Sequence, residues 1–181
     1  MTTVGGVCES LALKWLKVKS KEKDSGKLKP AERVGIVDRD KTVEKAFARY
    51  AASESDQKIG LESYYGLKGT WQVMPTGNTP VGITSFVARK VADSTHEYFL
   101  HSIKCPKYNN GNHAIAYYTS GGKGGLFKHV YMFDPDFGEY KVPPSKFVTW
   151  MPEFVKEFYG AGEGDSRWLK QVSLGAKTPT P

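Results

Sequence analysis

The chain has 181 residues, a formal net charge of +7, and 39% hydrophobic and 25% charged residues. This balance is typical of one folded domain, and it excludes a disordered tail. No apolar run approaches the roughly 20 residues of a membrane-spanning helix, and no secretory signal precedes the first motif. We therefore expect a single domain over residues 1–176, a frayed tail over 177–181, and no stable membrane insertion.

A lysine-rich stretch runs from Lys14 to Lys29 and holds much of the positive charge. Few apolar residues interrupt it, so we expect a solvated loop beyond the first helix. From Lys17 to Lys29 no aromatic residue that could stack on bases is interleaved with the lysines, so we expect no nucleic-acid partner. The positive charge suits an acidic partner such as an acidic protein surface, but it also suits simple solubility, which its concentration in one stretch favours.

The first half of the chain predicts helices. An apolar stripe formed by Leu11, Trp15 and Val18 indicates a helix over residues 6–18. A second helix is expected over 40–52. A third is expected over 80–92, with Pro80 at its first position. Glycines and prolines between 53 and 78 leave room only for short elements.

The second half is rich in aromatic and β-branched residues separated by turn residues. Helices followed by an antiparallel sheet indicate an α+β fold, with a helical N-terminal part. The expected elements are strands over 97–103, 113–119, 127–133 and 139–142, a helix over 145–159, and a last strand over 167–174.

Two cysteines, Cys8 and Cys105, are too few for a disulfide scaffold or a four-thiolate zinc site. Cys8 falls in the first turn of the expected helix, where the helix dipole and free N–H groups favour a thiolate. The backbone N–H of Cys8 would also point toward a developing oxyanion. The alternative is that Cys8 is a small buried core residue.

His113 opens an expected strand directly after a Gly-Asn turn. An imidazole at this position can take a proton from a thiol and return it to a leaving group. The alternative is a strand-end histidine that only bonds a loop. His96, His101 and His129 are the competing bases, but no glycine turn lies beside His101 or His129.

Asp134 ends the strand that we expect to pair with the strand of His113, since sequential strands are usually neighbours. Its carboxylate could accept the second imidazole N–H and fix the tautomer. The alternative is a plain turn, because Asp-Pro-Asp-x-Gly is good turn chemistry without any catalysis.

The order of cysteine, histidine and carboxylate is that of papain-like cysteine hydrolases. Three motifs indicate which family of these hydrolases the chain is similar to: Gly-Val-Cys-x-x-Leu-x-x-x-Trp-Leu at 6–16, Asn-His-Ala-Ile-Ala at 112–116, and Phe-Asp-Pro-Asp-Phe-Gly-Glu-Tyr at 133–140. Together they resemble the YopT/AvrPphB-type cysteine peptidases, a family of bacterial effectors. The resemblance extends from the first motif to about residue 142.

The resemblance implies a papain-like fold in which Cys8 is the nucleophile, His113 the general base and acid, and Asp134 the orienting carboxylate. It also implies no metal or cofactor. The expected activity is that of a virulence effector or toxin, secreted by a specialised bacterial system, which cleaves a protein in the cytoplasm of a recipient or host cell. We expect a monomer, with a cognate inhibitor or immunity protein as a further partner.

The sequence departs from the family in two respects. The loop between His113 and Asp134 looks longer than usual, and the oxyanion hole lacks its expected side chain. Family members carry an oxyanion-hole side chain a few residues before the cysteine, but neither Gln nor Asn precedes Cys8 here. We expect the hole to use backbone N–H groups and a distant side chain, or a segment upstream of this sequence.

Two other classes of function stay open. The same thioester chemistry serves deamidases, transglutaminases and acyltransferases. A non-enzymatic module that docks an acidic partner through its lysines, with Cys8 as a packing residue, is the alternative from a different class.

Overall fold

The computed structural model describes residues 7–22, 28–38, 61–73, 83–122 and 127–174, and the single positions 43, 45, 48, 51 and 52. Its described elements begin with helices, and the strands of one sheet follow with further helices between some of them. In order they are α1 (Val7–Glu22), α2 (Pro30–Asp38), the 3-10 helix η1 (Leu61–Tyr65), β1 (Leu67–Val73), α5 (Ile83–Asp93), β2 (Tyr98–Cys105), η2 (Pro106–Tyr108), β3 (Gly111–Thr119), β4 (Val130–Asp134), β5 (Gly138–Val142), α6 (Pro144–Tyr159), η3 (Glu163–Asp165) and β6 (Ser166–Leu174).

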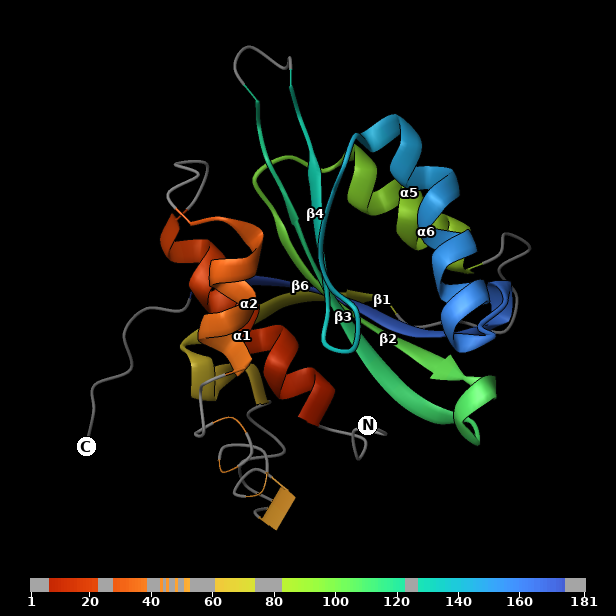
Figure 1. The fold of residues 1–181 in the computed structure, drawn as a ribbon, viewed down its shortest axis with the longest axis horizontal. Helices are drawn as coiled ribbons and strands as arrows, with labels where there is room; N and C mark the ends of the chain where they lie inside the picture. Colours follow the sequence, from red (N-terminus) through yellow and green to blue (C-terminus); the bar gives the residue numbers. More distant parts are fainter. Residues whose placement is uncertain are drawn as a thin grey trace.

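The strands form one antiparallel six-stranded sheet in the order β1-β6-β2-β3-β4-β5. Helices α1 and α2 lie on one side of the sheet, and α5 and α6 lie on the other (Figure 1). This arrangement confirms the expected α+β class. The last strand along the chain, β6, is an inner strand of the sheet and lies between β1 and β2.

Alternation along the strands builds a separate core on each side of the sheet. In β3, Ala114, Ala116 and Tyr118 pack into the cluster that contains α1. Ile115 and Tyr117 pack into the cluster that contains α5 and α6. Because both faces of β3 are buried, it is a rigid support for any side chain near its start.

Helix α1 is longer than the sequence predicts, and over residues 19–22 this corrects the expected solvated loop. It continues into the lysine-rich stretch as far as Glu22, and Lys19 is only 2% exposed. Residues 23–27 of the stretch lie outside the described residues. The Lys19 ammonium lies 3.8 Å from the centre of the Tyr131 ring and 5.3 Å from that of Tyr118. Aromatic faces of the sheet therefore bury a lysine that the local pattern assigns to solvent.

Helix α2 is an element that the sequence pattern does not predict. Its Arg33 donates Nε and Nη2 to the two carboxylate oxygens of Glu139, at 2.8 and 2.6 Å. Arg33 also pairs with Glu22 at 2.8 Å, and Trp15 donates its indole N–H to Glu139 at 2.8 Å. All three charged side chains are buried. This network joins α1 and α2 to β5, and it holds the segment directly after Asp134.

Several other expected elements lie partly or wholly outside the residues that the structure describes. Between residues 53 and 78, where only short elements are expected, the structure describes the five-residue helix η1 and the seven-residue strand β1, whose types the pattern does not specify. Of the helix expected over 40–52, only the five single positions are described, and these are helical. The expected boundary at 176 and the tail lie outside the described residues. None of the described helices is long and apolar enough to span a bilayer.

Candidate active site

Cys8 is the second residue of α1 and is 2% exposed. It begins the buried stripe Cys8, Ala12, Trp15 and Lys19, which follows the helical period. In the same stripe, Trp15 stacks on Phe133 at 5.6 Å, with the two rings nearly parallel. The packing of α1 on the sheet therefore fixes the position of the sulfur.

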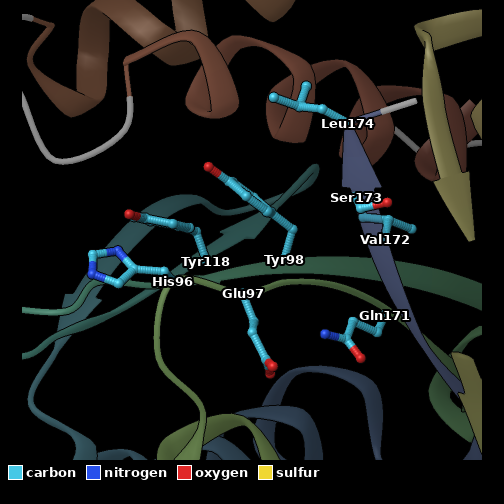
Figure 2. Close-up of a pocket in the computed structure, with 8 residues that line it drawn as sticks. All are labelled: His96, Glu97, Tyr98, Tyr118, Gln171, Val172, Ser173 and Leu174. Atoms are coloured by element: carbon cyan, nitrogen blue, oxygen red, sulfur yellow. The ribbon is translucent and has the colours of Figure 1, made fainter. Parts of the chain in front are cut away.

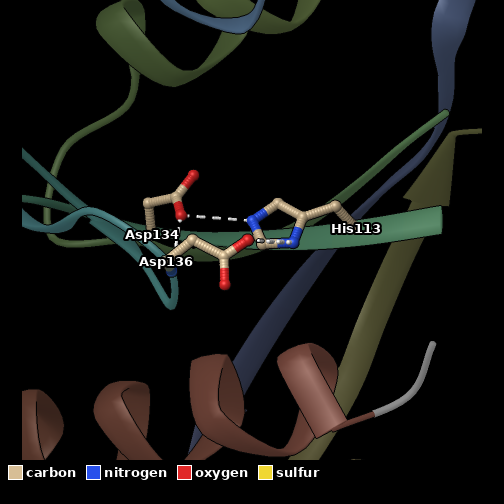
Figure 3. A group of neighbouring side chains, drawn as sticks. All are labelled: His113, Asp134 and Asp136. Carbon is tan, nitrogen blue, oxygen red and sulfur yellow. Dashed lines mark hydrogen bonds and ion pairs between the residues drawn. The ribbon is translucent and has the colours of Figure 1, made fainter. Parts of the chain in front are cut away.

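Strands β3 and β4 separate near the start of β3. Their pairing runs from Thr119 only as far as Ala116, which lies opposite Phe133. His113 and Asp134 face each other across the gap between the two strands (Figure 3), and His113 Nε2 lies 3.2 Å from Asp134 Oδ1. The structure thus brings together two of the three candidate residues, both buried.

A tight turn holds the Asp134 carboxylate in place. Asp134 Oδ1 accepts the backbone N–H of Asp136 at 2.9 Å and that of Phe137 at 3.3 Å. Gly138, with φ of +94°, lets the chain turn back into β5. The carboxylate is fully buried. The Asp-Pro-Asp-x-Gly turn therefore also orients the acid, so the turn and the site are not alternatives.

His113 is in contact with the third candidate as well. Burial lowers the pKa of His113, but hydrogen bonds to Asp134 and Cys8 and the negative charge of both partners raise the pKa to about 10. The bond to Cys8 joins the start of α1 to the start of β3. Since Nε2 is occupied by Asp134, we infer that Nδ1 is the nitrogen that exchanges a proton with the sulfur. An imidazole with a raised pKa favours an ion pair with a thiolate.

Tyr159 is a site residue that the sequence analysis missed. Its hydroxyl donates to Asp134 Oδ1 and Oδ2, at 2.8 and 2.9 Å, and lies 2.9 Å from His113 Nε2. Its ring stacks on the His113 ring at 4.5 Å. Tyr159 closes an apolar stripe of α6, so periodicity alone places it in the core. The usual need of a buried phenol for a hydrogen-bond partner was the available signal.

Asp136 is a second addition to the site. Its Oδ2 lies 3.8 Å from His113 Nδ1, and its side chain is 31% exposed (Figure 3). His113, Asp134 and Asp136 are the set within the described residues whose spacing could hold a metal ion. However, His113 Nε2 and both oxygens of Asp134 already bond to protein groups, so the arrangement is suited to moving protons.

The competing histidines lie elsewhere. His101 is fully buried between the Tyr117 hydroxyl at 2.8 Å and Ser166 Oγ at 3.0 Å, and burial lowers its pKa to about 3. It is therefore neutral and enclosed. The ring of His129 bonds the carbonyl of Phe127 in the connection between β3 and β4, at the far end of β3 from His113.

A groove with a volume of about 610 Å³ lies away from these residues. It is formed by the first residues of β2, the end of β3 and the last residues of β6, with His96 at its rim (Figure 2). Tyr98 and Tyr118 stack within it at 4.8 Å. Cys8, His113 and Asp134 do not line it, so side-chain geometry and not groove size locates the candidate site.

Comparison with solved structures shows the same fold in an avirulence protein of Pseudomonas, AvrPphB. The TM-score is 0.62 with 18% sequence identity, and the match covers 93% of this chain and 92% of the other. This likeness agrees with the papain-like α+β architecture expected from the motifs. A comparison with curated proteins finds no match.

Comparison with protein families gives a match to peptidase family C58, described as Yersinia/Haemophilus virulence surface antigen. The match extends over residues 1–175, so it includes all three motifs and all three candidate residues. The chain therefore belongs to the C58 family of cysteine peptidases, which comprises virulence proteins.

Proposed function

We propose that this chain cleaves peptide bonds with Cys8 as nucleophile, His113 as general base and acid, and Asp134 as the carboxylate that orients the imidazole. The observation that carries the proposal is the unbroken chain of hydrogen bonds from Cys8 through His113 to Asp134. These three residues come from three different elements of the fold. The family match independently supports cysteine peptidase chemistry.

In this proposal each group has its own task. His113 takes the thiol proton through Nδ1, and the resulting thiolate attacks the substrate carbonyl. The imidazolium then protonates the departing amine, which leaves an acyl-thioester on Cys8. His113 next takes a proton from water, the hydroxide attacks the thioester, and Cys8 is released as the thiol. Throughout the cycle, Asp134 keeps the proton on Nε2.

We further propose a YopT-like effector that reaches the cytoplasm of a recipient or host cell by a bacterial secretion system and cleaves a protein there. The net charge of +7 supports a target with an acidic surface. A monomer with a separate inhibitor or immunity protein as a partner is part of the same proposal.

Labelling of new N-termini in a recipient-cell extract tests the peptidase. Extract treated with the wild-type chain is compared with extract treated with Cys8→Ala and with Cys105→Ala, a control that removes the other buried thiol. We expect new N-termini with the wild type and with Cys105→Ala, and none with Cys8→Ala.

The same samples separate the remaining classes. Target proteins that keep their length but gain the mass of deamidation or acylation would replace the peptidase with a related thiol enzyme. Equal cleavage by Cys8→Ala and wild type would overturn the assignment of the nucleophile. A thiol-directed peptide probe that labels Cys8 in the His113→Ala variant as fast as in the wild type would overturn the assignment of the base.

A further inference from the structure

We propose that Tyr159 is a positioning residue of this site: its hydroxyl accepts the Nε2 proton of His113 and donates its own proton to Asp134, which fixes the imidazole for exchange with Cys8. The inference rests on the proposed function, because it assigns how the same histidine is held. It stands on the contacts of one hydroxyl group with both members of the pair.

The hydroxyl lies between the two groups. It is 2.8 and 2.9 Å from the oxygens of Asp134 and 2.9 Å from His113 Nε2. The direct distance from Nε2 to Asp134 is longer, at 3.2 Å. The shorter route between imidazole and carboxylate therefore passes through the phenol.

The number of protons decides which group donates to which. An ionised carboxylate only accepts, so the single phenolic proton is directed to Asp134. Burial and the charge of Asp134 raise the pKa of Tyr159, so the phenol keeps this proton. The phenolic oxygen is then free to accept, and Nε2–H is the donor beside it. With the proton on Nε2, Nδ1 is the nitrogen left for the thiol.

Helix α6 holds the phenol in this position. Tyr159 is the last residue of α6, and Gly160, with φ of +69°, ends the helix through bonds from its N–H and that of Ala161 to the last turn. Aromatic rings of Tyr108 and Phe137 meet the Tyr159 ring edge-on at 5.9 and 5.8 Å. The ring is therefore enclosed, stacked on His113, and only 1% exposed.

Tyr159→Phe tests the hydroxyl alone, because it keeps the ring stacked on His113. Tyr140→Phe is the matched control, since the Tyr140 hydroxyl bonds the backbone carbonyl of Phe137 at 3.4 Å. The first readout needs no substrate: it is the pH dependence of Cys8 alkylation by iodoacetamide, measured in a Cys105→Ala background. The second is the pH profile of peptidase activity on a target identified with the wild type.

Loss of the hydroxyl removes an acceptor from the imidazolium, so the ion pair with the thiolate forms over a narrower pH range. In Tyr159→Phe we expect the alkylation midpoint to move up, and the alkaline limb of activity to move down, by about half a pH unit or more. We expect kcat to fall about tenfold with KM within about twofold. Tyr140→Phe is expected to match the wild type in each measurement.

A Tyr159→Phe profile that coincides with that of Tyr140→Phe would overturn the proposal, even if its melting temperature falls. If Tyr159→Phe does not fold, fluorotyrosine at position 159 keeps the ring and weakens the phenolic oxygen as an acceptor. The alkylation midpoint should then also move up, and an unchanged midpoint would overturn the proposal. Failure of the proposed function looks different: His113→Ala would then leave the alkylation profile of Cys8 unchanged.

Discussion

Arg33→Met should strongly destabilise the fold, because it removes the cation from a buried network of charged side chains. The Arg33 side chain is 3% exposed, and it is the partner of Glu139, whose side chain is fully buried, and of Glu22, whose side chain is 7% exposed. Methionine keeps most of the volume of the arginine stem but leaves these carboxylates without their cation. The perturbation therefore tests charge and not packing.

The size of the effect follows from burial. Removing one partner of a buried ion pair typically costs about 3–5 kcal/mol, because the remaining charge stays desolvated. The free energy of unfolding of an ordinary domain is about 5–15 kcal/mol, so this loss is a large part of the total. With a urea dependence of about 2 kcal/mol per molar, we expect the unfolding midpoint to fall by roughly 1.5–2.5 M.

The assay is urea unfolding followed by far-UV circular dichroism at pH 7. Arg89→Met is the matched control, since Arg89 is an exposed residue of α5. A second control, Arg33→Lys, keeps a cation in the network, so it should lose less stability than Arg33→Met. A loss for Arg33→Met within about 1 kcal/mol of that for Arg89→Met, or equal losses for Arg33→Met and Arg33→Lys, would refute the reasoning.

Three further predictions concern the site and its surroundings. Cys8→Ala should abolish cleavage with a melting temperature within a few degrees of wild type; a lost circular-dichroism spectrum would show instead that the sulfur is needed for folding. Burial raises the pKa of Cys105 to about 12, so iodoacetamide at pH 6 should modify Cys8 and spare Cys105 in peptide mass spectra, and equal labelling would contradict this. Burial raises the pKa of Glu9 from 4.5 to about 6, with Lys170 opposing and Glu62 adding to the effect. The stability contributed by protonated Glu9 is therefore present below pH 4.5 and is lost as the pH rises through 6. Unfolding of Glu9→Gln should accordingly match wild type at pH 4 and be harder by about 1–2 kcal/mol at pH 8, whereas equal stability at pH 8 would argue against a desolvated carboxylate.

The strands and the long helix α6 of the second half follow from local pattern, because their apolar residues recur with the period of a strand or of a helix. Strand β3 is expected over 113–119 and is found from Gly111 to Thr119. Helix α6 is expected over 145–159 and begins at Pro144. Pro144 at the first turn and Gly160 after the last are boundary signals that the sequence carries openly.

The N-terminal helices could not be predicted in full, because distant residues stabilise them. Lys19 is helical and buried only because Tyr131 and Tyr118 lie across from it in the sheet. Helix α2 has nine residues with a glycine inside, and Arg33 anchors it to Glu139, which is 106 positions away. No local pattern contains either contact.

The candidate site also contains residues that the sequence predicts and residues that it does not. Cys8, His113 and Asp134 were found because each lies at the boundary of an element and within a motif. Asp136 lies within the same motif but was assigned to the turn alone. Tyr159 was missed because an aromatic residue in an apolar stripe predicts packing. Only the structure shows that its hydroxyl contacts both His113 and Asp134.

The sulfur and the imidazole belong to different layers of the molecule, a helix and a sheet that meet only through long-range packing. An unfolded chain carries the two groups on distant parts of a coil, so the proposed peptidase has no assembled site at that stage. Under the proposed function, completion of the fold is therefore itself the activating event.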